Sequence, residues 1–330
     1  MPTQYRAALV GCGGISNRQA NAYVEQGNVE LVAACDINPE NLKKRCDELE
    51  IPGRYSTHEA LFEAEKDLDF VSICTYPKAH AEQTIAAAKA GVRGVMCEKP
   101  MCISLKEADS MIDACRESGT KLAIAHRHRQ NPNFTRAREL VAEGAIGDPR
   151  LVWCYLSSCV IDNGTHIVDM MRYLLGDPEA DWVMGQASRK KDTLYQQSPA
   201  EESGLGLVAF KTGTRAMVEM GELVPEDGFQ FRILGTDGNL EATQSGVDLI
   251  DRSGTKTFQE PPTQGFVKQT RELIAWVEGG PGHRNAGEIA RATTEILMAI
   301  HESARTRELI HLPLASGDYP MQVRLDEEGK

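Results

Sequence analysis

The sequence predicts two domains, a doubly wound α/β domain with a parallel sheet followed by an α+β domain. Three observations support this prediction. Short apolar runs alternate with helix signals over residues 1–125, a glycine cluster directly follows the first run, and long β-type runs succeed one another after residue 126. A chain of 330 residues is also too long for one ordinary core and suits two domains, which we place at 1–125 and 126–330.

The apolar runs of the first domain are continuous, which is typical of strands buried on both faces of a parallel sheet. They span residues 6–10, 29–35, 69–75, 94–97 and 121–125. Helix starts separate them: Asn38 precedes a proline, and Ser56 and Ser104 open capping boxes of the form S-x-x-E. This alternation predicts a doubly wound sheet with helices between successive strands.

The glycine cluster reads G-C-G-G-I-S and matches the dinucleotide-binding fingerprint G-x-G-x-x-G except at its last position. In that fingerprint, glycines permit a tight turn and let the backbone approach a pyrophosphate at a helix N-terminus. The predicted cofactor contacts are Gly11, Gly13, Gly14, Ile15 and Ser16. Asp36 ends the second strand, where a carboxylate binds the ribose 2′-hydroxyl of NAD and repels the 2′-phosphate of NADP. The sequence therefore predicts a Rossmann domain that binds NAD, with NADP less favoured; the alternative is a glycine turn with Asp36 capping the next helix.

Long β-type runs dominate the second domain, at residues 149–160, 181–188, 204–220 and 228–236. Asp237-Gly238 is a turn signal inside a hairpin. Because these strands follow one another without intervening helices, they predict an open, mostly antiparallel sheet.

One helix stands out in this domain, at residues 162–177. Its apolar residues follow the helical period and predict a core-facing stripe: Ile167, Met170, Met171, Leu174 and Leu175. Asp162 and His166 are four residues apart, so they share a face at the helix start, outside the stripe. Because a helix N-terminus disfavours the imidazolium cation, His166 is suited to act as a base there. On spacing alone, an equal alternative is that Asp162 only caps the helix and His166 only pairs with it.

Composition excludes several classes of function. With 36 Lys and Arg against 48 Asp and Glu, the net charge of −12 leaves no basic face for nucleic acid. No apolar run approaches the roughly 18 residues of a membrane span, and the N-terminus lacks the pattern of a signal peptide. The nine cysteines include no C-x-x-C pair and are expected to be reduced thiols in a cytoplasmic protein.

Taken together, the motifs of the two halves resemble the Gfo/Idh/MocA oxidoreductases, which include glucose–fructose oxidoreductase and inositol dehydrogenases. The matching motifs are the glycine fingerprint, the triplet Glu98-Lys99-Pro100 after the fourth apolar run, and D-x-x-x-H at Asp162 and His166. Smaller matches include the loop from Thr75 to His80 and the closing helix at 287–305. The resemblance extends over nearly the whole chain.

The resemblance implies roles for these motif residues. Lys99 would lie beside the nicotinamide, hold the reacting hydroxyl and stabilise the alkoxide that develops there. His166 would be the general base, and Asp162 would bind a neighbouring substrate hydroxyl. Pro100 restricts Lys99 to an extended backbone, although the sequence leaves the isomer of the Lys99–Pro100 bond open. Glu98 would border the nicotinamide, and the loop that walls the cofactor would comprise Thr75, Tyr76, Pro77 and His80.

The run His126-Arg127-His128-Arg129 follows the fifth apolar run, where relatives supply substrate contacts. Strand-like alternation sends the two histidines to one side and the two arginines to the other. We expect substrate contacts from His126 and from Arg129, which matches an arginine found just ahead of a proline in the family. No metal site is expected at the two histidines, because no acid or cysteine is spaced to complete it.

Three functions are compatible with these motifs. The first is an NAD(P)-dependent dehydrogenase that moves hydride between nicotinamide and a secondary hydroxyl or ketone of a sugar, glycoside or cyclic polyol. The second is a glycoside hydrolase or lyase that uses bound NAD as a transient oxidant with no net redox change. The third is a non-catalytic dinucleotide-binding regulator, which the presence of Lys99, Asp162 and His166 disfavours. By analogy with the family's open sheet, we also expect a homodimer or homotetramer.

Overall fold

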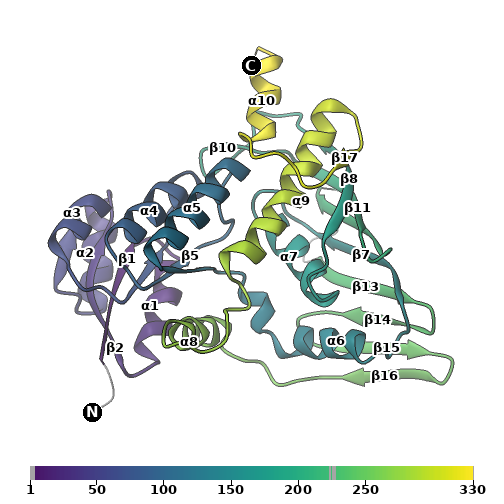
Figure 1. The fold of residues 1–330 in the computed structure, drawn as a ribbon, viewed down its shortest axis with the longest axis horizontal. Helices are drawn as coiled ribbons and strands as arrows, with labels where there is room; N and C mark the ends of the chain where they lie inside the picture. The colour runs from purple at the N-terminus through teal and green to yellow at the C-terminus, as the bar shows by residue number, and fades with distance from the viewer. Residues whose placement is uncertain (1–3, 223, 225–227, 330) are drawn as a thin grey trace. The chain divides into compact units, whose positions relative to one another are not determined.

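The computed structural model describes residues 4–222, 224 and 228–329 of the chain. They form two compact units, each built on its own large sheet (Figure 1). The first unit comprises the residues up to 102, 107–127 and 264–288, and the second comprises 103–106, 128–263 and the residues from 289 onward. One boundary was predicted, after residue 125. In the structure, the segment 264–288 also belongs to the first unit, because its helix packs against the parallel sheet.

The first unit contains a six-stranded parallel sheet in the order β3-β2-β1-β4-β5-β6. Its strands are β1 (Tyr5–Val10), β2 (Val29–Cys35), β3 (Gly53–Tyr55), β4 (Phe70–Ile73), β5 (Gly94–Cys97) and β6 (Lys121–Ile124). The predicted doubly wound sheet is confirmed. The edge strand β3 was not predicted, since its three residues contain no apolar run.

Helices cover both faces of this sheet, with α3, α4 and α5 on one face and α1 and α8 on the other (Figure 1). The helices of this unit are α1 (Ser16–Val24), α2 (Pro39–Glu48), α3 (His58–Ala64), α4 (Pro77–Lys89), α5 (Leu105–Ser118) and α8 (Gly265–Val277). Leu273 and Ile274 of α8 join the core around Phe70 of β4. Gly94 makes room for this packing, because a Cβ there would lie 2.9 Å from the Phe70 ring and 3.0 Å from Val277.

The helix starts of the first unit follow the capping residues closely. Asn38 caps α2 as predicted, with its side chain accepting two backbone N–H groups. Helix α5 begins directly after Ser104, in agreement with the second predicted box. The first box is wrong by one residue, because Thr57 rather than Ser56 is the N-cap of α3 and accepts a backbone N–H.

The second unit contains a nine-stranded sheet in the order β16-β15-β14-β13-β7-β12-β11-β8-β17. Its neighbouring strands are antiparallel except for β7 and β12, which run parallel. The strands are β7 (Pro149–Leu156), β8 (Ala180–Ser188), β11 (Ser203–Phe210), β12 (Arg215–Gly221), β13 (Phe229–Gly235), β14 (Gly238–Ala242), β15 (Val247–Asp251), β16 (Gly254–Phe258) and β17 (Ile310–His311). A separate small hairpin pairs β9 (Leu194–Tyr195) with β10 (Ser198–Pro199). The predicted open, mostly antiparallel sheet is confirmed, and the turn at Asp237-Gly238 joins β13 to β14.

Helices cover one face of the nine-stranded sheet. Helix α7 (Gly164–Leu174) packs on β7 and β12, and α6 (Pro132–Ala142) packs on β14 and β15. Helix α9 (Gly287–Thr306) places Ile300 directly over Gly185 and Gly206 of β8 and β11. The remaining helices are η1 (Arg127–Gln130), a 3-10 turn, and α10 (Pro320–Glu327).

Helix α7 is buried along its whole length. The predicted stripe is confirmed by Ile167, Met170, Met171 and Leu174, which are all fully buried. The helix is shorter than the predicted span of 162–177, since Asn163 is its N-cap and Leu175 its C-cap. Within the described residues, no helix combines the length and apolarity needed to cross a membrane.

Candidate active site

The glycine loop leaves β1 through a turn that requires glycine. Gly11 has a φ of +92°, and a Cβ at this position would lie 2.8 Å from the backbone carbonyl of Cys74. The loop therefore passes against the end of β4, the strand beside β1.

Gly13 and Gly14 face open space, because a Cβ built on either would meet no atom within 4 Å. Ile15 is the N-cap of α1, so the loop ends at a helix N-terminus. A pyrophosphate needs close backbone approach and partial positive charge, and this loop offers both. The predicted cofactor residues from 11 to 16 form one continuous loop that fits a dinucleotide.

Asp36 directly follows β2, beside this loop. Its carboxylate accepts the N–H of Cys12 at 2.7 Å and the N–H of Asn38 at 2.7 Å. Each carboxylate oxygen has a further lone pair, which a ribose hydroxyl can use. The alternative role of Asp36 as a helix cap is wrong, since Asn38 is the residue that caps α2.

An arginine that the sequence analysis missed closes the loop from the other side. Arg45 of α2 is buried, and its Nε donates to Ser16 Oγ at 3.0 Å. Ser16 Oγ in turn donates to the carbonyl of Gly13 at 2.6 Å. The signal for such a partner was the serine itself, because a buried hydroxyl in the last fingerprint position needs a hydrogen-bond partner.

The triplet Glu98-Lys99-Pro100 follows β5 at the carboxyl edge of the parallel sheet. Glu98 is buried and accepts Nε2 of Gln19 at 2.6 Å, and burial raises the pKa of its carboxyl. Lys99 comes next and is partly exposed, and the Lys99–Pro100 bond is cis. Lys99 therefore stands where a doubly wound sheet binds its ligand.

The loop after β4 lies beside this triplet, and His80 joins the two. The buried ring places Nδ1 2.9 Å from the carbonyl of Pro100 and Nε2 3.2 Å from that of Thr75. Burial lowers the pKa of His80, which favours the neutral ring, and its one N–H can donate to only one of these two carbonyls. Pro77 begins α4, and Tyr76 before it is 53% exposed. His80 was predicted only as part of the cofactor wall, whereas its buried ring lies against both loops of the sheet edge.

In the second unit, His166 lies in the first turn of α7 and is buried. The ring of His128, from the segment before α6, packs edge-on against it with the centroids 4.6 Å apart and the planes at 89°. His128 also packs against Phe229 of β13 at 4.7 Å. The sequence analysis did not connect the two histidines, since no local pattern links them.

Asp162 lies in the loop before α7, one residue ahead of the N-cap Asn163. Ser158 Oγ donates to its Oδ2 at 2.9 Å. Glu201 holds this loop by accepting a hydrogen bond from the N–H of Val160. Its other carboxylate oxygen lies 3.0 Å from Nε2 of His301. The side chains of Glu201 and His301 are fully buried.

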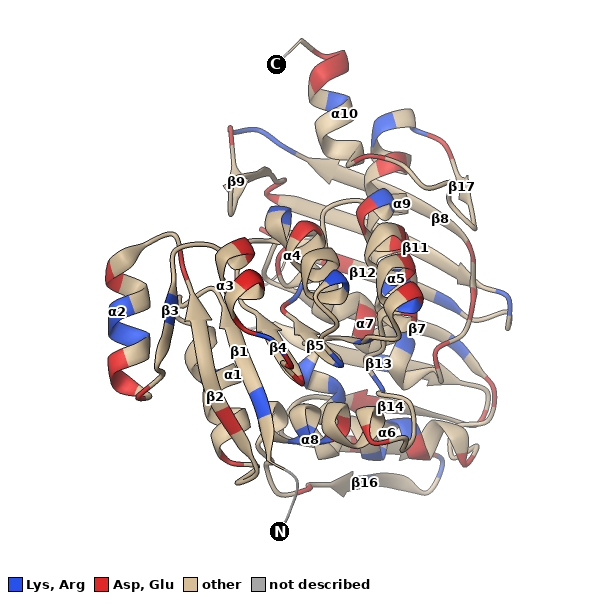
Figure 2. Cartoon of the chain, turned by 60° about the vertical axis from the view of Figure 1, so that its left-hand side comes forward, with Lys and Arg blue, Asp and Glu red and all other residues tan. Residues whose placement is uncertain are grey.

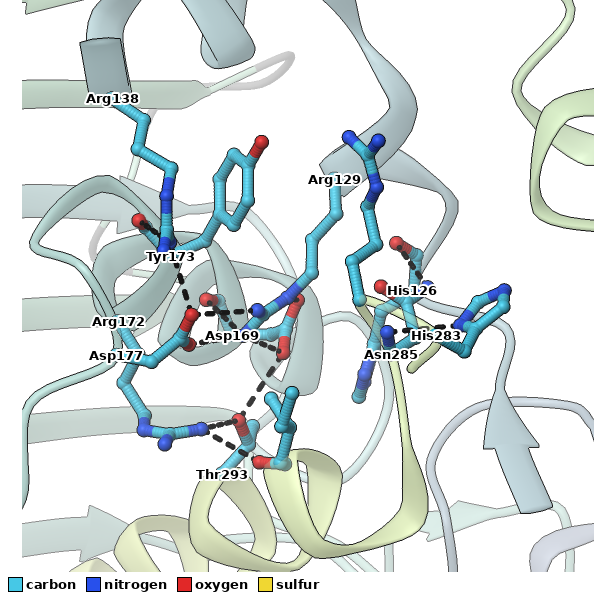
Figure 3. Close-up of polar contacts among 12 residues, drawn as sticks. His126, Arg129, Arg138, Asp169, Arg172, Tyr173, Asp177, His283, Asn285 and Thr293 are labelled. Carbon is cyan, nitrogen blue, oxygen red and sulfur yellow. Dashed lines mark hydrogen bonds and ion pairs between the residues drawn. The ribbon is translucent and has the colours of Figure 1, made fainter. Parts of the chain in front are cut away.

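The contacts of Arg129 do not support the prediction that it binds the substrate (Figure 3). Its guanidinium is 1% exposed and binds Asp169 through Nε and one terminal nitrogen, each at 2.8 Å. Both terminal nitrogens also donate to Asp177, and the guanidinium lies 5.1 Å from the ring centre of Tyr173. This network ties the segment before α6 to α7, so Arg129 holds the second unit together.

The predicted alternation of residues 126–129 is wrong as well. The backbone turns into the 3-10 segment Arg127–Gln130 there, so side chains no longer alternate between two faces. His126 belongs to the first unit, is buried, and accepts Nδ2 of Asn285 on its carbonyl at 3.0 Å (Figure 3). Its substrate contact stays a prediction.

Among the described residues, one group of metal-ligand type brings its atoms within 4.8 Å of one another: His58, Glu59 and Glu82. Both carboxylates are exposed, and such surface groups are common without an ion. Neither His126 nor His128 belongs to this group.

Comparison with known proteins gives matches over most of the chain. Residues 5–126 match the family model described as "Oxidoreductase family, NAD-binding Rossmann fold", and residues 156–241 match the GFO/IDH/MocA C-terminal domain. The chain is 25% identical to a D-apiose dehydrogenase of Paraburkholderia graminis, covering 96% of this chain and 92% of that one. It is 28% identical to a D-xylose 1-dehydrogenase (NADP(+)) of Haloferax volcanii, covering 92% and 98%.

A solved structure shares the fold over 94% of the chain. A levoglucosan dehydrogenase in complex with NADH and levoglucosan superposes with a TM-score of 0.85 at 21% identity, covering 94% of this chain and 100% of that one. With its two domain models, its glycine loop and its parallel sheet all in agreement, the chain belongs to the GFO/IDH/MocA family and is an NAD-binding oxidoreductase.

Proposed function

We propose that this chain is an NAD-dependent dehydrogenase that moves hydride between nicotinamide and a secondary hydroxyl or ketone of a sugar, glycoside or cyclic polyol. The observation that carries the proposal is the position of Lys99, at the carboxyl end of β5, in the same sheet edge as the open glycine loop. A relative named as a D-apiose dehydrogenase and one named as a D-xylose dehydrogenase support the substrate class.

The roles of the residues follow from their chemistry. When bound, the nicotinamide supplies the hydride acceptor for the carbinol carbon. The ammonium of Lys99 stabilises the negative charge that develops on the substrate oxygen. His166 takes the hydroxyl proton, and Asp162 binds a neighbouring hydroxyl that orients the substrate. His128, whose ring packs against His166, holds that imidazole in position.

A preference for NAD over NADP belongs to the same proposal. Asp36 carries a carboxylate that two backbone N–H groups fix beside the glycine loop. A fixed negative charge accepts a ribose hydroxyl and repels a 2′-phosphate. The relative from Haloferax volcanii is named for NADP(+), so the preference needs its own measurement.

The proposal is tested by the absorbance of reduced nicotinamide. The protein is mixed with NAD or NADP and a panel of inositols, aldoses, glycosides and sugar acids. We expect reduction on one compound class, with NAD favoured in kcat/KM. Lys99→Ala should lower turnover by about 10²–10⁴-fold, which is the contribution of a positioned polar or acid–base group.

Lys89→Ala is the matched control, since Lys89 is an exposed lysine of the same unit at the end of α4. It should leave turnover unchanged. Loss of less than about tenfold in Lys99→Ala would show that Lys99 does not stabilise the alkoxide. Silence of the wild-type protein across the whole panel, with NADH binding intact, would contradict the dehydrogenase itself.

We also propose that the protein is a homodimer or homotetramer joined through the uncovered face of its nine-stranded sheet. Four apolar side chains lie in register across that face: Met184, Leu207, Met217 and Trp153. Met184 is 49% exposed in the single chain. A row of large apolar side chains on an open face is typical of a protein–protein interface.

A cytoplasmic location is proposed on the basis of the cysteines. All nine are free thiols, and eight of them are buried. Burial raises the pKa of Cys12, Cys35 and Cys115 to about 12, which keeps these thiols protonated and unreactive. Reduced, inert thiols are the usual pattern in a reducing compartment.

A further inference from the structure

The last position of the glycine fingerprint holds a serine, and that serine is fully buried. Its Oγ donates to the carbonyl of Gly13 at 2.6 Å and accepts Nε of Arg45 at 3.0 Å. A terminal nitrogen of Arg45 lies 3.4 Å from the same Gly13 carbonyl. Two side chains from different helices therefore converge on one backbone oxygen of the loop.

Arg45 is held in this position by further bonds. Its other terminal nitrogen donates to Asn17 Oδ1 at 2.8 Å and pairs with Glu48 at 2.7 Å. Helix α2 carries charges of both signs along its length (Figure 2), but its lysines 43 and 44 are exposed, whereas Arg45 is buried. Arg45 is therefore a built part of the loop and not one of the surface charges of α2.

The direction of the Gly13 carbonyl decides what the loop presents on its open side. The bond between Gly13 and Gly14 is trans, so the C=O of Gly13 and the N–H of Gly14 point in opposite directions. Because Ser16 and Arg45 hold the C=O on the protein side, the N–H of Gly14 points away from them. Because Gly13 and Gly14 have no side chains, the space on the open side of the loop stays free.

Two successive glycines make this peptide easy to rotate, since glycine populates a wide range of backbone conformations. A rotated peptide would present the carbonyl oxygen to an anion in place of the N–H. We propose that Arg45, through Ser16, is a positioning residue that fixes the Gly13–Gly14 peptide so that its N–H faces the pyrophosphate of the dinucleotide. The proposal builds on the NAD-binding assignment and concerns one part of that cofactor.

The proposal is tested with ligands that contain or lack the pyrophosphate. Binding of NADH and of ADP-ribose is measured by calorimetry, and binding of adenosine by competition against NADH. In Arg45→Met we expect NADH and ADP-ribose to bind about tenfold more weakly, the usual effect of losing one charge-assisted hydrogen bond. Adenosine, which lacks the pyrophosphate, should bind within twofold of wild type.

Ser16→Ala is the second variant, and it removes the hydroxyl that relays the contact. Ser16→Ala should weaken the binding of ADP-ribose by a similar factor. This loss is expected here even though alanine is a common residue at this fingerprint position. Because both residues act on one carbonyl, the double variant should be no weaker than the more affected single variant. Lys44→Met is the matched control, since Lys44 is the adjacent cation of α2, is 73% exposed and approaches the same Glu48.

Three results would overturn the proposal. The first is ADP-ribose binding within twofold of wild type in Arg45→Met or in Ser16→Ala. The second is an equal loss for adenosine, which would mean that Arg45 only supports the unit as a whole. The third is a double variant whose loss of ADP-ribose affinity equals the product of the two single losses. Because all three are binding results, they are separate from any failure of the protein to oxidise a sugar.

Discussion

At the residue scale, the buried guanidinium of Arg129 is bound by two carboxylates of its own unit, one fully buried and one partly exposed. Asp169 and Asp177 supply the carboxylates, and Tyr173 covers one face of the guanidinium. Thr293 donates to Asp169 and accepts a hydrogen bond from Arg172, which extends the network into α9 (Figure 3). Removing one charge from such a set leaves another charge buried without its partner.

Arg129→Met should therefore destabilise the protein by about 3–5 kcal/mol, the usual result of breaking a buried ion pair. Denaturation by urea measures this change. Arg150→Met is the control, because Arg150 is 65% exposed and its pair with Asp148 should contribute less than about 1 kcal/mol. A stable Arg129→Met protein with a KM raised about tenfold would instead restore the substrate contact that the sequence indicated.

The carboxylate of Glu201 links pH to the loop that carries Asp162. Burial opposes its ionisation, but the charge and hydrogen bond of His301 prevail and lower the pKa of Glu201 below its ordinary value. A lowered pKa in the folded state gives stability above the unfolded carboxyl pKa of about 4.3. That stability is lost as the pH falls through the folded pKa.

Glu201→Gln should accordingly cost the most stability near neutral pH. The difference in free energy of unfolding between wild type and variant should be about 1–3 kcal/mol at pH 7 and should shrink on acidification below about pH 4.3. Urea denaturation at a series of pH values measures it. A difference that is constant across this range, or that grows on acidification, would show that the Glu201 charge does not matter.

The sequence could single out Lys99, Asp162 and His166 as candidates, because each lies in a short motif at the end of a predicted element; their roles stay predictions. It could not locate Arg45 or His128, since their partners are far away along the chain and only the fold brings them together. Arg129 was assigned wrongly for the same reason. Its carboxylate partners lie on and just beyond α7, which is outside the reach of any local pattern.

At the element scale, the turn from β1 to α1 contains two kinds of glycine. Gly11 has a positive φ and touches the Cys74 backbone, whereas Gly13 faces open space. The fold therefore requires glycine at position 11, whereas at position 13 only the approach of a ligand requires it. Their substitution should therefore separate the stability of the unit from its binding of cofactor.

Gly11→Ala should lower the stability of the protein by about 1–3 kcal/mol, the cost of a residue forced into a sparsely populated conformation, with further loss from the clash. Gly13→Ala should leave the melting temperature unchanged and weaken NADH binding, because the new methyl group occupies the space that the pyrophosphate approaches. Thermal unfolding and NADH titration measure the two effects. Equal melting temperatures for both variants would contradict this division.

The segment at 126–130 shows where periodicity fails as a guide. Its alternating histidines and arginines follow a strand in the sequence, which favours a continued strand. The parallel sheet ends with β6 at Ile124, however, and the chain then turns through η1 into the second unit. An alternating pattern of four residues is too short to distinguish a strand from such a turn.

At the scale of the whole molecule, the first unit includes a helix that comes from residue 265 onward. No helix was predicted over the residues of α8 (Gly265–Val277), and its packing on the parallel sheet was not predicted either. Long-range pairing of this kind depends on the chain's return path, which has no local signal. The fold class could therefore be predicted in both halves, whereas the return of residues 264–288 to the first unit could not.

The proposed association of subunits through the open face of the nine-stranded sheet is tested by placing a charge on that face. Leu207→Glu places a carboxylate in the middle of the row formed by Met184, Leu207, Met217 and Trp153. The wild-type protein should be a dimer or tetramer in light scattering, and Leu207→Glu a monomer. Thr255→Glu, on the exposed strand β16, should keep the wild-type mass. A wild-type monomer at micromolar concentration would remove the proposed interface.

The central claim is net hydride transfer from substrate to cofactor, and the fate of a deuterium label tests it most directly. Each compound of the panel is prepared with deuterium on its carbinol carbons and incubated with NAD, and the nicotinamide cofactor in solution is examined by mass spectrometry. The account predicts deuterated NADH in solution in equal amount to a ketone product. Deuterium that returns to a cleaved sugar, with no reduced nicotinamide released, would contradict it and identify a redox-neutral hydrolase or lyase.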